Sequence, residues 1–174
     1  DVGLSDTSGV VREGLPTMFV STPIWRTKTE VMATLAFRIQ PNEMFAPTLQ
    51  NSRFETTGET YAFDRNGLLL SDSRFSESLR EIGLLTPGHS DLTLELRDPG
   101  VDLADGGRPR LPRKDQPLTR MAQSATRGES GSDLKGYRDY RGVPVVGAWL
   151  WDDALGFGIA SEIDVDEAYA FSNN

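Results

Sequence analysis

The segment from Gly58 to Phe75 constrains the fold more than any other stretch of the sequence. Residues 60–63 carry two aromatic side chains on one face and predict a strand, and the leucines at 68–70 predict its returning partner. Between them, Asn66-Gly67 supplies the positive backbone φ angles that a tight hairpin turn requires. The segment therefore predicts a β-hairpin, and with it an antiparallel sheet in the middle of the chain.

Residues 30–40 form the most regular strand pattern in the chain. The odd-numbered side chains from Val31 to Ile39 are all apolar, whereas the even-numbered ones from Met32 to Arg38 are small or mixed. We expect the apolar face to meet a layer of helices, and the other face to line water or a cavity. Further strands rich in β-forming residues are predicted at 17–25, 143–151 and 157–163.

Short helices are predicted between these strands, at residues 41–54, 76–82, 118–125 and 165–171. The last helix begins at Asp164, and Glu167 lies three residues further on, as in a capping box. A long irregular segment, about 83–135, predicts an insert of the kind that forms a lid or binding loop. No internal repeat is apparent. The order predicts one α+β domain over residues 1–174, with a central antiparallel sheet of five to six strands and flanking helices.

The charge balance excludes several classes of partner. The chain has 26 acidic residues against 18 lysines and arginines, which gives a net charge of −8. Nucleic acids and anionic lipid surfaces need a basic face, so neither is expected to bind. The chain lacks cysteine, and no apolar run reaches the roughly 18 to 20 residues of a membrane span. Because it opens at Asp1 without an initiator Met, we interpret it as an excised or processed fragment.

The sequence lacks the common catalytic and metal-binding patterns. His89, the single histidine, lies in a Pro-Gly-His-Ser loop without the Gly-x-Ser-x-Gly turn of a serine hydrolase. Residues 164–167 hold three acids but lack the spacing of an EF-hand loop, and no phosphate-binding glycine loop is present. We therefore expect no enzyme activity, no metal and no cofactor. A glycosidase-type pair of carboxylates stays open, because any two acids can converge in a fold.

A ligand-binding cavity is the function that the residues themselves suggest. Trp25, Tyr61, Phe63 and Trp149 lie on or beside predicted strands, and binding pockets are commonly aromatic with one or two polar anchors. Arg38 ends a strand face that is otherwise lined by small residues, so it is the candidate anchor for a carboxylate. Two plainer interpretations stay open: the aromatic side chains form the core, and Arg38 forms a surface ion pair.

Several segments resemble the Cache family of PAS-like sensor domains. The best match is Gly-Glu-Thr-Tyr-Ala-Phe-Asp-x-x-Gly at 58–67 followed by Leu-Leu-Ser-x-Ser-Arg-Phe at 69–75, which is similar to the central hairpin of Cache domains. Residues 19–25 and 34–39 resemble the family's first two strands. A subgroup found on receptors with cyclase, kinase or phosphatase output domains is similar, in order, at residues 97–100, 117–119, 136–143, 147–149 and 162–168.

The resemblance implies a PAS-like extracytoplasmic sensor domain, and so a periplasmic part of a bacterial inner-membrane receptor. Such a domain would bind a small molecule, relay the signal through its C-terminal helix to a cyclase or kinase output domain, and be able to form a homodimer. Amine-binding members carry an aspartate where this chain has Arg38, and their Arg-x-Trp-Tyr signature is missing, which implies an anionic ligand. The alternatives are a ligand-free relay or dimerisation module in the membrane-proximal half of a double Cache receptor, and a secreted hydrolase.

Overall fold

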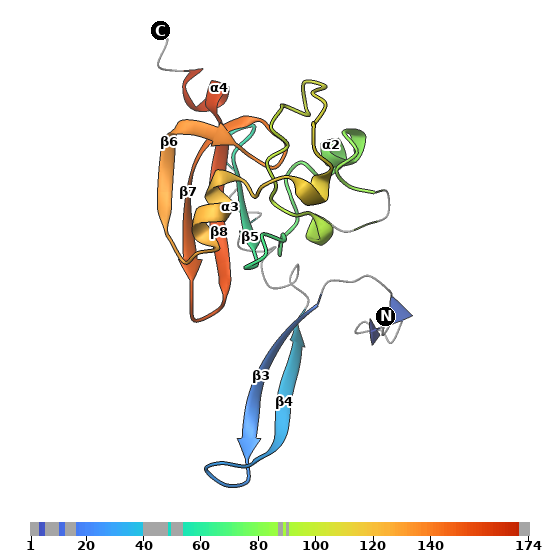
Figure 1. Ribbon diagram of the computed structural model, residues 1–174, viewed down its shortest axis with the longest axis vertical. Coiled ribbons are helices and arrows are strands. Elements are labelled where there is room, and N and C mark those ends of the chain that lie inside the picture. Colours follow the sequence, from blue (N-terminus) through green and yellow to red (C-terminus); the bar gives the residue numbers. More distant parts are fainter. Residues whose placement is uncertain are drawn as a thin grey trace.

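The centre of the molecule is a four-stranded antiparallel sheet with strand order β5-β8-β7-β6 (Figure 1). The computed structural model describes residues 4–5, 11–12, 17–39, 49, 54–86, 89 and 91–170. The four strands are β5, Glu59–Phe63; β6, Gly131–Arg138; β7, Pro144–Asp152; and β8, Phe157–Asp164. Because β8 pairs with both β5 and β7, the first and last strands of this sheet in sequence are neighbours.

Turn residues set the antiparallel pairing after β5. The Asp64 carboxylate accepts hydrogen bonds from the backbone N–H groups of Asn66 and Leu68, both at 2.8 Å, and Gly67 has a φ of +78°. Glycine suits this left-handed conformation because it has no Cβ. The returning segment then pairs with the end of β5. The hairpin predicted within residues 58–75 is therefore confirmed.

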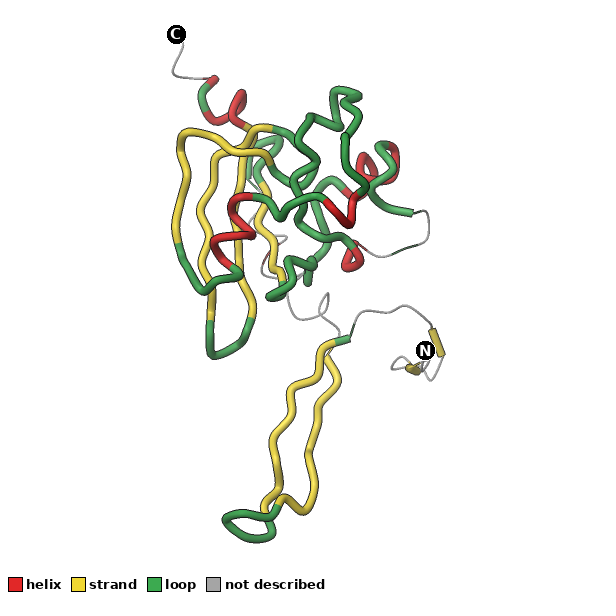
Figure 2. Tube along the Cα trace, viewed as in Figure 1, coloured by secondary structure: helices red, strands yellow, loops and turns green. Residues whose placement is uncertain are grey.

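One face of the sheet is covered by short helices and loops (Figure 2). The helices are α2, Ser76–Glu81; η1, Asp91–Thr93; η2, Arg113–Asp115; and α3, Arg120–Ala125. Much of this layer comes from the predicted insert at 83–135, whose Leu85, Leu94, Leu96 and Met121 are buried in the main core cluster. The segment thus completes the hydrophobic core instead of forming a loose lid.

The opposite face of the sheet carries a second, smaller core cluster. Leu49, Ala62 and Phe157 are buried there, and Leu70 and Ile159 pack against them. Successive side chains of a strand point to opposite faces, so β8 meets the main cluster on one side and this smaller cluster on the other. Strands β5 and β8, which pair with each other at one side of the sheet, are therefore covered on both faces.

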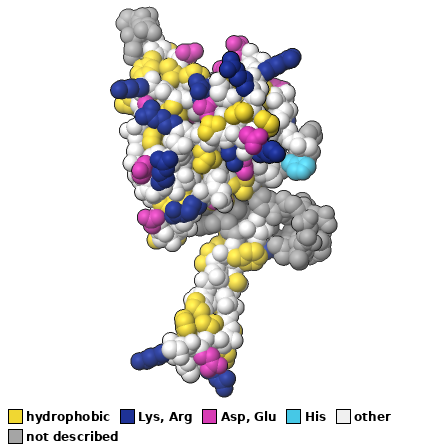
Figure 3. Space-filling view, viewed as in Figure 1, with side chains coloured by type: hydrophobic (Ala, Val, Ile, Leu, Met, Phe, Trp, Pro, Cys, Tyr) yellow, Lys and Arg dark blue, Asp and Glu magenta, His cyan; other side chains and the backbone are white. Residues whose placement is uncertain are grey.

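A second hairpin lies apart from this sheet. Strands β3, Met18–Trp25, and β4, Val31–Ile39, pair with each other and project away from the four-stranded sheet (Figure 1). Both strands are confirmed, but they form their own sheet, so the central sheet has four strands where five to six are predicted. The face expected to meet helices is exposed, and hydrophobic side chains line the hairpin (Figure 3). Two short strands precede it, β1, Leu4–Ser5, and β2, Val11–Arg12.

Several element boundaries also differ from the predictions. The helices predicted at 76–82 and 118–125 are confirmed as α2 and α3. Strand β6 begins at Gly131, inside the predicted insert, because this segment pairs antiparallel with residues 144–149 of β7. The helix predicted at 41–54 lies almost entirely outside the described residues.

The C-terminal helix is present, but its predicted capping box is wrong. Helix α4 spans Val165–Ala168, and Asp164 makes no side-chain cap hydrogen bond to it. The Asp164 carboxylate instead forms an ion pair with Arg141 at 2.7 Å. Glu167 accepts hydrogen bonds from residues 56–57, which lie before β5. Both carboxylates therefore bind partners from other parts of the chain instead of forming a capping box at the start of α4.

Candidate functional site

Three of the predicted ligand-binding residues meet on the inner face of the sheet. Tyr61 and Phe63 of β5 and Trp149 of β7 all belong to the main core cluster. The Tyr61 and Phe63 ring centroids lie 6.2 Å apart, and Trp149 meets Tyr137 edge-on at 6.0 Å. These side chains fill the face on which a pocket is predicted, so here they act as packing residues. Ligand binding by them stays a prediction.

The other two predicted residues, Trp25 and Arg38, lie on the β3–β4 hairpin. Trp25 is 55% exposed at the end of β3, and Arg38 is half-buried near the end of β4. Because β4 pairs with β3 in a separate sheet, the structure does not bring these two residues to Tyr61, Phe63 and Trp149 (Figure 1). The prediction assumes that all five residues lie on or beside strands of one sheet. The topology contradicts this assumption, because β3 and β4 form a sheet of their own.

A buried carboxyl group lies among the aromatic side chains of the inner face. The Tyr61 hydroxyl donates to Glu162 Oε2 and the Tyr137 hydroxyl donates to Glu162 Oε1, both at 2.6 Å. Glu162 lies on β8 opposite Gly147, where an added Cβ would come within 2.7 Å of the Tyr137 hydroxyl. Sequence reasoning missed Glu162. Its position in the strand could have revealed it. Glu162 follows the buried Ala160 by two residues, so both side chains point to the same face of β8.

Burial raises the pKa of Glu162 to about 8, because the ionised carboxylate loses its hydration inside the core. The neighbouring Asp139 and Glu59 carboxyl groups act in the same direction, whereas the two tyrosine hydrogen bonds oppose them. At neutral pH the folded protein therefore favours the protonated form of Glu162. Glu162 lies on β8, the strand that leads directly into α4.

A second buried carboxyl group, Glu59, begins β5. It accepts hydrogen bonds from the Tyr140 hydroxyl, from the Ser73 hydroxyl at 3.3 Å and from the Arg74 backbone N–H at 3.0 Å. Burial raises the pKa of Glu59, and the hydrogen bond from Tyr140 opposes this shift. Glu59 and Glu162 are both sealed from solvent, so they do not form the accessible carboxylate pair that a glycosidase uses.

Arg141 ties the turn after β6 to the end of β8. Its guanidinium contacts Asp139 at 2.6 Å and Asp164 at 2.7 Å, and it lies 3.7 Å from the centroid of the Phe75 ring. Burial raises the pKa of Asp139 to about 6, although the charge of Arg141 works against that rise. Hydrogen bonds to charged groups are stronger than neutral ones, so this cluster fixes the end of β8 before the chain enters α4.

The segment that precedes β5 and the helix that follows β8 meet at one junction. Glu167 of α4 accepts hydrogen bonds from the backbone N–H groups of Thr56, at 2.9 Å, and Thr57, at 2.7 Å, and from the Thr57 hydroxyl. That hydroxyl in turn accepts a hydrogen bond from the Asp164 backbone N–H at 3.1 Å. The hydrogen bonds, led by that from the Thr57 side chain, lower the pKa of Glu167 to about 2. The incoming segment and the outgoing helix thus share one hydrogen-bond network.

Arg74 holds the incoming segment from its other side. The guanidinium donates hydrogen bonds to the backbone carbonyls of Glu55, at 2.9 Å, and Gly58, at 2.5 Å. Its own backbone N–H bonds to Glu59, as described above, so Arg74 connects the incoming segment to the buried end of β5. Residues 54–58 are therefore tied by hydrogen bonds both to Arg74, which contacts β5, and to Glu167 of α4.

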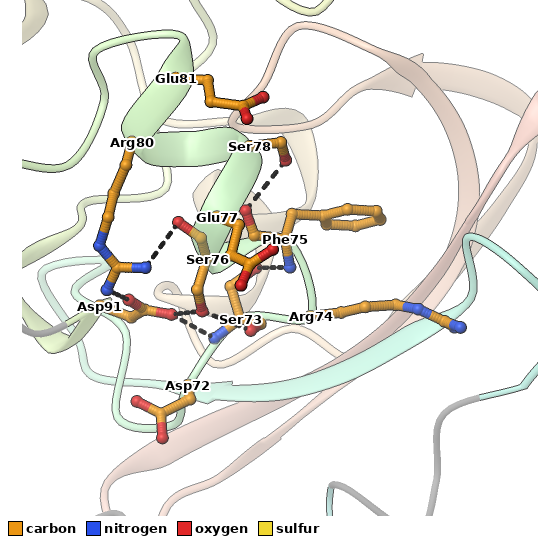
Figure 4. Close-up of a pocket in the computed structure, with 10 residues that line it drawn as sticks. All are labelled: Asp72, Ser73, Arg74, Phe75, Ser76, Glu77, Ser78, Arg80, Glu81 and Asp91. Carbon is orange, nitrogen blue, oxygen red and sulfur yellow. Dashed lines mark hydrogen bonds and ion pairs between the residues drawn. The ribbon is translucent and has the colours of Figure 1, made fainter.

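An open groove of about 720 Å³ lies beside Arg74 (Figure 4). It is lined by residues 72–78, Arg80, Glu81 and Asp91. Asp91 is buried at its base and accepts hydrogen bonds from the Ser73 backbone N–H, at 3.1 Å, and from the Ser76 hydroxyl. The Arg80 guanidinium also forms an ion pair with the Asp91 carboxylate, at 3.4 Å. In the close-up, the Arg80 side chain reaches down to Asp91, whereas the Arg74 side chain extends away from it (Figure 4).

Two other kinds of site are not found among the described residues. No group of three or more acidic or histidine side chains in this part of the chain is placed to hold a metal ion. No helix there combines the length and the apolar character that crossing a bilayer requires.

A solved structure shares this fold. It is the extracellular domain of a protein described as a histidine kinase, mmHK1S-Z3, with a TM-score of 0.55 and 14% sequence identity. The similarity covers 92% of this chain and 49% of that one, so this chain spans about half the length of its structural relative. The α+β, PAS-like architecture is confirmed. Neither protein-family models nor curated protein sequences gave a match.

Proposed function

We propose that the chain is an extracytoplasmic sensor module of a transmembrane signalling receptor, and that it relays a signal from its incoming segment to α4. The observation that carries the proposal is the junction, in which Glu167 binds Thr56 and Thr57. The fold shared with an extracellular receptor domain supports the same assignment. An inner-membrane anchor, a homodimer and a cytoplasmic output domain of the cyclase or kinase type belong to this proposal.

The relay would operate as a shift between two packings of the same elements. A displacement of residues 54–58 acts on Glu167 through the two threonine amides, and it acts on β5 through Arg74. Strand β5 pairs along its length with β8, with Glu59 opposite Glu162. Both routes converge on the point where β8 passes into α4, so this helix is the element that carries the change onward.

The packed inner face favours a relay that needs no ligand between the sheet and its helices. Tyr61, Phe63 and Trp149 occupy that space, and Glu162 is already bound by two tyrosine hydroxyls. A ligand at this place would have to displace large buried aromatic side chains, each of which contributes much of the core's burial energy. We therefore favour the relay form of the sensor module over one with a ligand in the inner face.

The junction provides the test of the relay. In Glu167→Ala, the Thr56 and Thr57 amides lose their acceptor, so we expect faster hydrogen exchange at both amides and an altered basal output of the intact receptor. The matched control is Asp166→Asn, the exposed neighbouring acid, which should change neither. If both amides exchange faster but the output of the receptor does not change, the hydrogen bonds of the junction exist but do not carry the signal. That result would refute the relay.

Binding of a small anion by the predicted residues is a second proposal. Arg38 shares its strand face with Ser21, Thr34 and Ala36, which have small side chains, and it lies opposite Phe19. We expect small carboxylates to raise the melting temperature of the chain, and Arg38→Ala to abolish this rise. Arg26→Ala, on the same hairpin, is the matched control. Equal shifts in the native chain and in Arg38→Ala would remove Arg38 from ligand binding.

A further inference from the structure

A second groove lies along the loop of residues 103–113, beside the end of α2 (Figure 1). It is open to solvent and has a volume of about 790 Å³, which is within the range of about 300–1,000 Å³ that is usual for small-molecule sites. Ile82, Leu103 and Leu111 supply part of an apolar lining. Glu81 lines both this groove and the one beside Arg74, so the two grooves are neighbours on the surface.

The groove is basic, although the chain as a whole is acidic. Three arginines line it, Arg108, Arg110 and Arg113, and among its described lining residues the one acid is Glu81. The arginines belong to the run Arg-Pro-Arg-Leu-Pro-Arg-Lys at residues 108–114, which holds four cations and no acid in a chain of net charge −8. A hollow lined by one sign of charge raises the local concentration of the opposite ion, so this groove favours an anion.

Arg108 and Arg110 are available to a ligand. Both side chains are exposed, and within the described part of the chain neither makes a hydrogen bond or an ion pair. Other exposed arginines of the module do have carboxylate partners, as Arg138 has in Asp98. A guanidinium presents a planar fork of N–H donors that matches the oxygens of a carboxylate or a phosphate. Two such groups on one groove therefore suit an oxyanion of more than one charge.

Arg113 adds a positive charge that has no counterion in contact. Its guanidinium donates hydrogen bonds to neutral oxygens, which are the carbonyls of Glu95, Arg97 and Tyr140 and the side-chain oxygen of Gln116. Among the described residues no carboxylate pairs with it, and its Nε is sealed from solvent without a hydrogen-bond partner. Burial, followed by the charge of Arg97, lowers the pKa of Arg113 to about 10. An anion in the groove would supply the missing negative charge.

The backbone that carries these arginines is held in place by the core. The Leu103 N–H donates to the Arg141 carbonyl at 2.9 Å, and the side chain of the buried Gln116 donates to the Leu111 carbonyl at 3.0 Å. Two prolines in the run at 108–114 restrict the backbone further. Because the loop is already ordered, it loses little conformational entropy when a ligand binds.

We propose that this groove is a binding site for a small organic dianion. Arg108 and Arg110 hold its charged groups, which are either a phosphate or two carboxylates, and Ile82 and Leu111 contact its apolar part. Arg113 contributes a fixed positive charge to the wall of the site. The site is distinct from that of Arg38, which lies on the separate β3–β4 hairpin, and it does not depend on the relay.

The test is a titration of the chain with three probes, followed by the NMR chemical shifts of the backbone amides. The probes are phenyl phosphate, phthalate and benzyl alcohol, which share an aromatic ring, and the first two are dianions whereas the third is neutral. We expect a dianion to shift the amides of Gly83, Gly106 and Gly107, which line the groove, and benzyl alcohol to leave them in place. A response to only one of the dianions identifies the charged group that the site prefers.

Two variants and a matched control show which side chains bind the anion. Arg108→Gln and Arg110→Gln should each weaken binding by about tenfold or more, because each removes hydrogen bonds to a charged group. Lys114→Gln removes the same charge from an exposed residue of the same run that does not line the groove, and it should leave the affinity nearly unchanged. Since all three side chains are exposed, the variants should keep the native melting temperature, so that a loss of binding does not reflect a loss of folding.

Three results would overturn the proposal. If neither dianion shifts the groove amides, or if benzyl alcohol shifts them equally, the groove is not an anion site. If Lys114→Gln weakens binding as much as Arg110→Gln, the anions respond to the charge of the whole run and not to a site. If the shifts occur in β3 and β4 and Arg38→Ala abolishes them, the anion binds to the hairpin instead.

Discussion

The two hairpins β3–β4 and β7–β8 have the same kind of strands but very different surroundings. Both have strands of eight or nine residues in antiparallel register. Yet Trp151 at the end of β7 is 7% exposed, whereas Trp25 at the end of β3 is 55% exposed. Alternating apolar residues specify a strand in both places, but burial depends on which other elements are present to pack against it.

Strands β4 and β8 also differ in the polar side chains that they carry. Strand β8 carries the buried Glu162, and β4 carries the half-buried Arg38. Around Glu162, two tyrosines from β5 and β6 complete a buried hydrogen-bond set. The site is therefore a product of neighbouring strands, and the strand that bears the carboxyl group could not form it alone.

The largest expected difference is between Trp151→Ala and Trp25→Ala. Trp151 packs near Phe63 and under the Arg65 guanidinium, so its truncation should lower the free energy of unfolding by about 3–5 kcal/mol. Trp25→Ala should change it by no more than about 0.5 kcal/mol, as expected for a surface substitution. Urea unfolding of both variants measures this. A comparable loss for Trp25→Ala would show that the hairpin belongs to the core of this module.

The next difference concerns pH and is tested by Glu162→Gln against Arg38→Gln. The pKa of Glu162 rises from 4.5 to about 8 on folding, so the folded state holds the extra proton and is favoured at low pH. Stability should fall as the pH rises from about 5 to 8, by at most about 1.4 kcal/mol per pH unit for this one group. Asp139, with its pKa raised to about 6, adds to the fall below that pH.

Glu162→Gln keeps a side chain that can bond to the tyrosines but removes the titrating group. We expect its free energy of unfolding to fall less steeply between pH 6 and 8 than that of the native chain, as measured by urea unfolding at several pH values, because Glu59 still titrates with a raised pKa. Arg38→Gln, on β4 of the other hairpin, should keep the wild-type slope. An unchanged slope in Glu162→Gln would mean that Glu162 is ionised in the folded protein at neutral pH.

The smallest expected effect is that of Tyr137→Phe, which removes one of the two hydroxyls on Glu162. The loss of this hydrogen bond should cost about 1–2 kcal/mol of stability. It should also move the decline of stability to higher pH, because the bond lowers the pKa of Glu162. Tyr169→Phe, which loses an exposed hydrogen bond to the Leu134 carbonyl, is the control and should leave the pH profile unchanged.

The sequence by itself determined most local structure. The Asp64, Asn66 and Gly67 turn, the alternation in β4 and β8, and the short helices α2 and α3 follow from backbone preferences and side-chain periodicity, which act over a few residues. The α+β class and the antiparallel pairing also follow, because short turns connect most of the strands.

Only the tertiary structure decided which strands share a sheet and which carboxyl groups are buried. The sequence pattern of β4 is the more regular, yet it is β8 that lies in the core, because β5 and β7 flank β8 and supply its hydrogen-bond partners. Glu162 accepts a hydrogen bond from Tyr61, and Glu167 accepts one from Thr57, only because residues about 100 positions away in the chain come within hydrogen-bond distance. Such contacts depend on the packing of whole elements, which local patterns do not encode.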